Sequence, residues 1–218
     1  MGRDNHPRQR RASQLQRKKP QRPAYDRILI VTEGEKTEVN YFEEIRRFYR
    51  LSSAHIRVCN SPYGTTPLQV VEYARDRCRE TFEWERVFCV IDRDDHQRYV
   101  EALNSAQTLD GKYPNDLGQP IVFSAIPSNP CFELWFLLHF QAHEAHIHRT
   151  DVFRLLRDRY LQGYEKGRHG IFEATMQHLD RAYANAERLR AHGQGRGLTN
   201  PSTCVDELVR ILCALRSY

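Results

Sequence analysis

Long apolar runs are missing from this sequence. No uninterrupted stretch approaches the roughly 20 residues that a membrane-spanning helix needs. The basic stretch at residues 1–23 also lacks the apolar segment that a secretory signal contains. With 218 residues, of which 40% are hydrophobic, the chain is long enough to form a sizeable core without covalent cross-links. We therefore expect a cytoplasmic protein with no membrane segment.

Paired cysteines are missing as well. The six cysteines show no C-x-x-C spacing, and most lie within apolar stretches such as residues 87–90. Structural zinc sites usually draw their ligands from closely spaced pairs, so this spacing argues against zinc. We expect the cysteines to be buried free thiols.

The net charge of +5 is concentrated in an N-terminal arm, residues 1–24. Its eight basic residues oppose one acid, and removing this +7 leaves −2 on the rest of the chain. The arm has too few apolar residues to fold alone, so we expect it to be disordered when free. It could clamp a phosphate backbone, with an affinity that falls with salt, or be a solvated tail. The side chains expected to contact nucleic acid are Arg8, Arg10, Arg11, Arg17, Lys18, Lys19, Arg22 and, beyond the arm, Lys36.

Strand and helix patterns alternate through the middle of the chain. Residues 28–32 and 87–91 are continuously apolar, which is typical of strands covered on both faces in a parallel sheet. Shorter strands are expected at residues 55–59 and 121–125, with amphipathic helices between them. The alternation predicts an α/β sandwich around a mainly parallel sheet.

Helix-start signals follow several of these strands. Thr66, Pro67 and Gln69 provide an N-cap, a first-turn proline and a capping-box partner. The dipeptides at residues 129–130 and 200–201, both Asn-Pro, have the same chemistry and predict helices directly after them. From residue 150 onward only helices are expected, at residues 151–161, 171–191 and 202–215. The predicted organisation is a basic arm at 1–24, an α/β core at 25–147 and a helical C-terminal region, packed on the core, at 148–218.

Acidic residues follow both central strands. Glu33 and Glu35 come after the first, and Asp92 and Asp94 come after residues 87–91. Ligands of open α/β sheets gather beyond the carboxyl ends of the strands, so neighbouring strands would bring these carboxylates together. Such oxygen ligands suit Mg²⁺ or Mn²⁺, and without a cation the like charges would repel. The alternative is that these acids are solvated loop residues or helix caps.

Other chemistries fit the pattern less well. Receiver domains and haloacid-dehalogenase-type phosphatases also keep acids at strand ends, but here the first strand delivers a glutamate rather than a nucleophilic aspartate. The lysine of a receiver is missing from residues 121–129. His139 and His143 have the i, i+4 spacing of one helix face, but they lack the intervening glutamate of a zinc protease. A partly exposed helix end is the preferred interpretation of these histidines.

The sequence from Ile28 to Glu38, together with the later Asp92-Arg-Asp94, resembles the Toprim domain of topoisomerases, bacterial primases and OLD-family nucleases. The resemblance is closest to the RloB-like branch and covers about residues 27–215. The segments that carry it are residues 33–38 (EGEKTE), 90–94 (VIDRD), 128–139 (SNPCFELWFLLH) and 200–203 (NPST). It implies a Toprim-like α/β fold and a metal-dependent reaction on nucleic acid.

The resemblance also implies roles for individual residues. Glu33 matches the signature Toprim glutamate, which binds metal or acts as general acid or base, and Asp92 and Asp94 match the pair that holds the metal. Glu35 and Glu38 lie where OLD-like nucleases place further acids, and one of them could complete a second metal position.

Three more residues are expected to support this site. Gly34 would let the backbone pass close to a phosphate. Asn129 and Glu133 belong to the RloB-like motif, although Asn129 is also explained as a helix cap.

Together these observations predict a nuclease that cleaves phosphodiester bonds with Mg²⁺ or Mn²⁺. RloB-like proteins resemble components of bacterial phage-defence loci (abortive infection) and are often encoded beside an AAA or ABC ATPase. The chain has no G-x-x-x-x-G-K-[ST] loop, so ATP dependence would come from such a partner. The alternative is a non-catalytic nucleic-acid-binding subunit whose acids hold a structural cation. The sequence leaves DNA and RNA open as the substrate.

Overall fold

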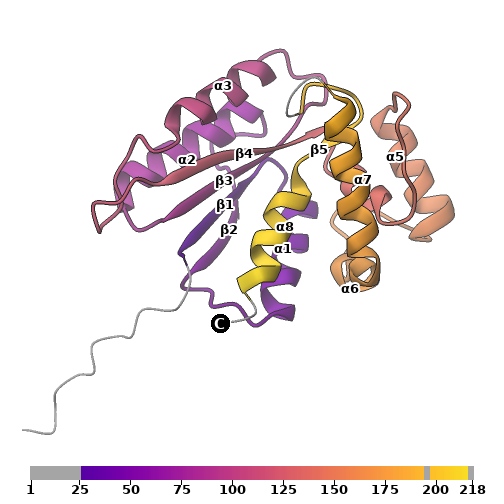
Figure 1. Ribbon diagram of the computed structural model, residues 1–218, viewed down its shortest axis with the longest axis horizontal. Coiled ribbons are helices and arrows are strands. Elements are labelled where there is room, and N and C mark those ends of the chain that lie inside the picture. Colours follow the sequence, from indigo (N-terminus) through magenta and orange to yellow (C-terminus); the bar gives the residue numbers. More distant parts are fainter. Residues whose placement is uncertain (1–25, 194–196, 216–218) are drawn as a thin grey trace, which may run out of the picture.

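The computed structural model describes residues 26–193 and 197–215, so the predicted arm and its basic residues lie outside the described part. The protein has an α/β fold built on one five-stranded sheet, with strand order β2-β1-β3-β4-β5 (Figure 1). The first four strands are parallel, as predicted, and the fifth is antiparallel. The strands are β1 (Ile28–Thr32), β2 (Ile56–Asn60), β3 (Arg86–Asp92), β4 (Val122–Asn129) and β5 (Ser202–Thr203).

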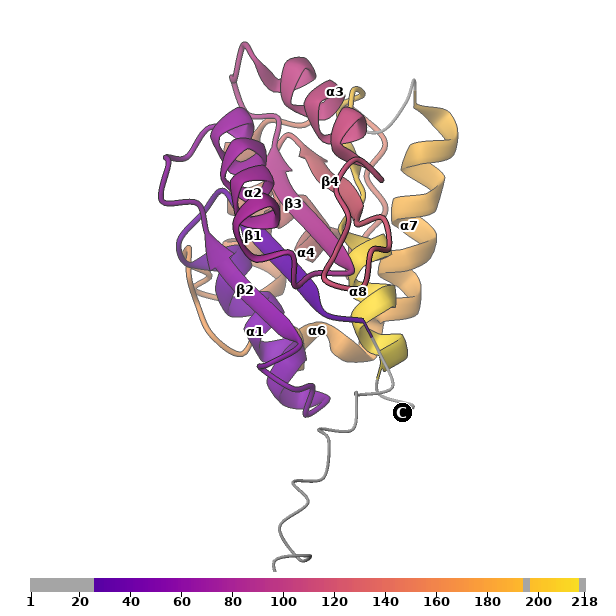
Figure 2. The same ribbon diagram turned by 90° about the vertical axis from the view of Figure 1, so that its left-hand side faces the viewer.

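Helices cover both faces of the sheet, which explains the unbroken apolar character of β1 and β3. Figures 1 and 2 show α2 (Pro67–Thr81) and α3 (Tyr99–Leu109) on one face, and α1 (Thr37–Phe48) and α8 (Val205–Ala214) on the other. Successive residues of β1 alternate between the two resulting apolar clusters: Ile30 packs with α1 and α8, and Val31 packs with α2 and α3. The sheet is therefore a buried central layer.

The predicted capping box at the start of α2 is confirmed. The Thr66 hydroxyl accepts a hydrogen bond from the Gln69 backbone N–H, and the Thr66 backbone N–H donates to the Gln69 side chain. These contacts satisfy donors that a helix start leaves without partners.

The two Asn-Pro dipeptides do not cap helices, contrary to prediction. Both peptide bonds are cis, and Asn129 is the last residue of β4. The Asn129 amide donates instead to the carbonyls of Gly197 and Leu198, at 3.4 Å each. The Asn200 amide exchanges two hydrogen bonds of 3.0 Å with the backbone of Ile147. The side chain of each asparagine thus bonds to a distant segment, so it does not cap the helix that follows.

The C-terminal region is not purely helical, because β5 pairs with the end of β4. A strand of two residues is too short to leave a sequence pattern, and it is held partly by a 2.9 Å hydrogen bond between the hydroxyls of Ser128 and Thr203. Two long helices that the sequence predicts here change their helical geometry along their length. The observed segments are α5 (Arg149–Leu155) with a π-helical continuation (Leu156–Tyr160), and α6 (Ile171–Thr175), a 3-10 turn (Met176–His178) and α7 (Leu179–His192).

The core is completed by α4 (Glu133–Leu138), whose side chains are all buried. His139 follows the end of this helix, so it does not share a helix face with His143. His139 is fully buried rather than partly exposed as predicted, and its Nδ1–H donates to the Trp135 carbonyl at 2.9 Å. Burial lowers the pKa of His139 to about 4.

The cysteines are free thiols, as predicted; four are buried, and Cys59 and Cys213 are partly exposed. In residues 26–193 and 197–215 no helix combines the length and the apolar character that crossing a bilayer requires.

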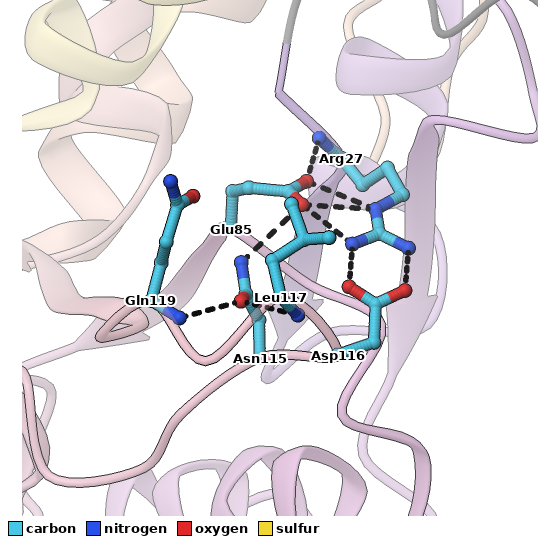
Figure 3. A network of polar contacts seen from close by, with 6 residues as sticks. All are labelled: Arg27, Glu85, Asn115, Asp116, Leu117 and Gln119. Carbon is cyan, nitrogen blue, oxygen red and sulfur yellow. Dashed lines mark hydrogen bonds and ion pairs between the residues drawn. The ribbon is translucent and has the colours of Figure 1, made fainter.

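A charged network closes the amino end of β1 (Figure 3). The Arg27 guanidinium contacts Glu85 Oε1 and Asp116 Oδ1, both at 2.5 Å, and Asn115 donates a further hydrogen bond to Glu85. The two carboxylates raise the pKa of Arg27. This network lies at the opposite end of the strand from Glu33, so it anchors the sheet without taking part in the acidic site.

Candidate metal centre

The carboxyl ends of β1 and β3 meet because the two strands are parallel neighbours. Thr32 pairs with Val90, and the Glu33 backbone N–H donates to the Val90 carbonyl at 3.2 Å. The Asp92 backbone N–H in turn donates to Glu33 Oε2 at 3.3 Å. The structure therefore brings together the two strand ends on which the sequence places acids.

Glu33, Asp94 and His96 form a group that could hold a cation: one ligand atom from each lies within 4.8 Å of the others. The His96 Nε2 atom is 3.0 Å from Glu33 Oε1. Asp94 has a φ of +33°, a left-handed conformation that aspartate tolerates better than most residues, and its N–H donates to the Pro130 carbonyl at 3.0 Å. This turn folds the loop after β3 back toward Glu33.

Asp92 lies deeper than this group and is not a member of it. Its side chain is only 9% exposed, and its Oδ1 atom has no hydrogen-bond partner among the described residues. Burial raises the pKa of Asp92 well above its ordinary value, and the charges of Glu38, Glu33 and Glu133 raise it further. Asp92 Oδ1 is therefore shielded from solvent and receives no hydrogen bond from the residues described.

Two further carboxylates come from helices on the α1 side of the sheet. Glu38 is 7% exposed, and its burial, helped by Glu133 and Glu33, raises its pKa to about 7. Glu133, in the apolar α4, is 2% exposed, and burial raises its pKa too, although Lys166 offsets part of this. The Tyr164 hydroxyl donates to Glu133 Oε1 at 3.3 Å. The predicted supporting residue Glu133 is thus part of the acidic cluster itself.

The electrostatics of this cluster favour a bound cation. Burial also raises the pKa of Glu33, and nearby Asp94 adds to the rise. Carboxylates that share a poorly solvated site must hold protons or be neutralised by positive charge. Carboxylate oxygens and an imidazole are suitable ligands, and the buried Oδ1 atoms of Asp92 and Asp94 have no other partner in the described chain. The residues present therefore fit a divalent metal ion.

Arg149, the first residue of α5, also reaches this site. Its Nη1 atom donates to Asp94 Oδ2 at 2.8 Å, so one oxygen of Asp94 is already paired with a cation. No sequence pattern indicates this contact, because it joins segments 55 residues apart. For His96 a signal did exist: it lies four residues after Asp92, in the same strand-end loop.

The remaining sequence candidates lie around the cluster. A Cβ atom on Gly34 would overlap the carboxylate of Glu38, so this glycine lets that side chain fold against the loop. Glu35 and Lys36 are exposed, and Glu35 is outside the group formed by Glu33, Asp94 and His96. Asn129 is buried and binds the loop at residues 197–198 rather than an acid.

A cleft of about 600 Å³ borders the site. It lies between the start of α2 and the loop after β3 and is lined by Thr66, Pro67, Leu68, Gln69, Glu72, Asp95, His96, Gln97 and Arg98. His96 is the residue shared by this cleft and the group with Glu33 and Asp94. A ligand in the cleft would therefore approach the acids past His96.

Comparison with known proteins gives one family. No curated protein and no solved structure matches the chain. The model of the family described as RloB-like protein matches residues 28–212, a span that includes both strand ends and every acid of the cluster. The chain therefore belongs to the RloB-like family.

Proposed function

We propose that the protein is a metal-dependent nuclease of the Toprim type, in which Glu33, Asp92 and Asp94 hold Mg²⁺ or Mn²⁺ against a phosphodiester. The observation that carries this proposal is a pair of buried oxygens, Asp92 Oδ1 and Asp94 Oδ1, beside Glu33 at the ends of adjacent parallel strands; neither oxygen has a hydrogen-bond partner in the part of the chain that the structure describes. A divalent ion bound there would orient the phosphodiester, activate a water and stabilise charge on the leaving oxygen.

The side chains of the site are prepared for this role by contacts within the chain. The Asp92 N–H holds one oxygen of Glu33, which leaves Oε1 toward His96. The carboxylates of Glu38 and Glu133 lie close enough to act on Asp92, and their negative charge increases the attraction of the site for a cation. Arg149, partly exposed beside Asp94, offers a guanidinium to a substrate phosphate.

We extend the proposal to the wider biological role on the basis of the family. Membership of the RloB-like family supports a part in bacterial phage defence with an AAA or ABC ATPase partner, and a cytoplasmic location. The basic arm and Lys36 would contact the flanking phosphates of DNA or RNA.

The test is cleavage of labelled supercoiled DNA, single-stranded DNA and total tRNA by purified protein with Mg²⁺, Mn²⁺ or EDTA. Cutting is expected with metal only, is expected to be lost in Asp92→Asn, and is expected to persist in Asp158→Asn, which changes an exposed acid elsewhere. Equal cutting by Asp92→Asn would contradict the assignment. Binding without cutting of any substrate would favour the non-catalytic nucleic-acid-binding subunit.

A further inference from the structure

We propose that His96 is a direct ligand of the metal ion, so that the centre is a mixed carboxylate and imidazole site that binds Mn²⁺ in preference to Mg²⁺. This inference rests on the proposed function, since it concerns the same cation.

Hydrogen bonds to the backbone of His96 fix the turn that carries its imidazole. The His96 N–H donates to the Arg93 carbonyl at 3.2 Å, and the His96 carbonyl accepts from Arg93 Nη1 at 2.8 Å and from the Tyr99 N–H at 3.3 Å. The Arg93 guanidinium also lies over the Tyr99 ring, 5.2 Å from its centroid. His96 is therefore held by the turn between β3 and α3 and not by its side-chain contact with Glu33 alone.

The distances suit one small cation. Ligand atoms bound to one such ion at about 2.1–2.2 Å lie within about 4.4 Å of one another. The ligand atoms of Glu33, Asp94 and His96 lie within 4.8 Å of one another, so small side-chain shifts would bring them onto one ion.

Each carboxylate keeps one oxygen for that ion. Asp94 Oδ2 pairs with Arg149, whereas Asp94 Oδ1 is buried and has no hydrogen-bond partner among the described residues. Glu33 Oε2 accepts the Asp92 N–H, whereas Oε1 is joined to His96 Nε2. A cation would replace the proton between Nε2 and Oε1 and would turn this hydrogen bond into shared coordination.

The burial of Asp92 is an independent observation in favour of a cation beside Glu33. Asp92 is about nine-tenths buried, its Oδ1 atom has no hydrogen-bond partner in the described chain, and its backbone N–H donates to Glu33 Oε2 at 3.3 Å. The group of Glu33, Asp94 and His96 therefore lies beside the buried carboxylate of Asp92 and is not simply a set of exposed acids.

The ligand types determine which metal is preferred. Mg²⁺ binds oxygen ligands in near-ideal octahedral geometry and gives up water reluctantly. Neutral imidazole is a frequent ligand of divalent transition metals, which accept nitrogen more readily. A histidine in the coordination shell therefore favours a first-row transition metal, here probed with Mn²⁺.

The test measures metal binding by the metal-free, full-length protein and not its activity. Mn²⁺ binding is followed by electron paramagnetic resonance of the free ion, Mg²⁺ binding by competition, and direct nitrogen ligation by ¹⁴N modulation of the bound Mn²⁺ electron spin echo. Wild-type protein is expected to show the ¹⁴N coupling. His96→Gln should lose it and bind Mn²⁺ on the order of 10-fold more weakly, with Mg²⁺ affinity changed less than about threefold. The control His192→Gln, at an exposed helix end, should match the wild type.

The other outcomes are distinguishable. Mn²⁺ bound by wild-type protein without ¹⁴N coupling, or with coupling retained in His96→Gln, overturns the role of His96 and leaves the proposed nuclease standing. If wild-type protein binds neither Mn²⁺ nor Mg²⁺, both the His96 ligand and the metal-dependent nuclease are overturned. Because the first result uses wild-type protein alone, a folding defect in the variant cannot obscure it.

Discussion

The Arg149 guanidinium donates to Asp94 Oδ2 at 2.8 Å, and the other oxygen of Asp94 is buried without a hydrogen-bond partner in the described chain. One side chain of the C-terminal region thus neutralises part of the acidic cluster at the end of β3. One carboxylate oxygen of Asp94 is thus paired with Arg149, and the other is available to the metal ion that we propose.

This arrangement predicts that Arg149→Gln binds divalent metal more tightly. Removing a positive charge near the site reduces repulsion of the ion by an amount equivalent to about threefold to tenfold in affinity. Arg149→Lys keeps the charge and should stay within about twofold of the wild type. Isothermal titration calorimetry with Mn²⁺ measures both variants, and weaker binding by Arg149→Gln would show that Arg149 helps to build the site instead.

Gly34→Ala should destabilise the protein by about 1–3 kcal/mol, because the new methyl group overlaps the carboxylate of Glu38, which has little room to move. Urea unfolding measures the free energy. In a Glu38→Ala background the cost of Gly34→Ala should fall below about 1 kcal/mol. Equal costs in both backgrounds would mean that the backbone at Gly34, and not Glu38, is responsible.

Glu38 should make the metal-free protein less stable as the pH rises from about 4.5 to about 7. Its pKa is about 7 in the folded protein against an ordinary 4.5, so in this window the folded state keeps a proton that the unfolded state has released. Glu38→Gln removes the effect and should be the more stable protein above pH 7, by up to about 3 kcal/mol. Urea unfolding in EDTA from pH 4.5 to 8 measures this, and parallel pH curves for the two proteins would refute it.

His139 should change the stability of the protein with pH in the opposite sense. Its folded-state pKa of about 4 lies below the ordinary 6.5, so the unfolded state takes up a proton first as the pH falls. Stability should therefore decrease from pH 6.5 toward pH 4, with a slope of at most about 1.4 kcal/mol per pH unit from this residue. Unfolding of His139→Asn should show a correspondingly shallower slope than that of His192→Gln, and identical slopes would argue against a neutral buried imidazole.

The part of the site on β1 and β3 was predictable from the sequence. Unbroken apolar runs identify strands covered on both faces, and parallel neighbours place Glu33 beside Asp92. The glutamate inside the apolar run of α4 was a further signal, because a charge within a buried helix needs a compensating environment.

The rest depends on tertiary packing. His96 reaches Glu33 only because Asp94 turns the chain with a positive φ. Arg149 reaches Asp94 only because α5, which packs against α4, begins beside the loop after β3. The asparagine of each Asn-Pro dipeptide carries the chemistry of a helix cap, and only its distant partners show that it binds elsewhere.

Whether Glu33 holds a catalytic metal ion is tested by the single-turnover rate of nucleic-acid cleavage by Glu33→Gln at saturating Mn²⁺. The amide keeps the shape of the side chain and can still accept the Asp92 N–H, but it removes the charge that we assign to the metal ion. We expect a rate at least about 100-fold below that of the wild type, equivalent to about 2.7 kcal/mol of transition-state stabilisation, with unchanged thermal unfolding of the metal-free protein. Cleavage by Glu33→Gln at the wild-type rate would contradict it.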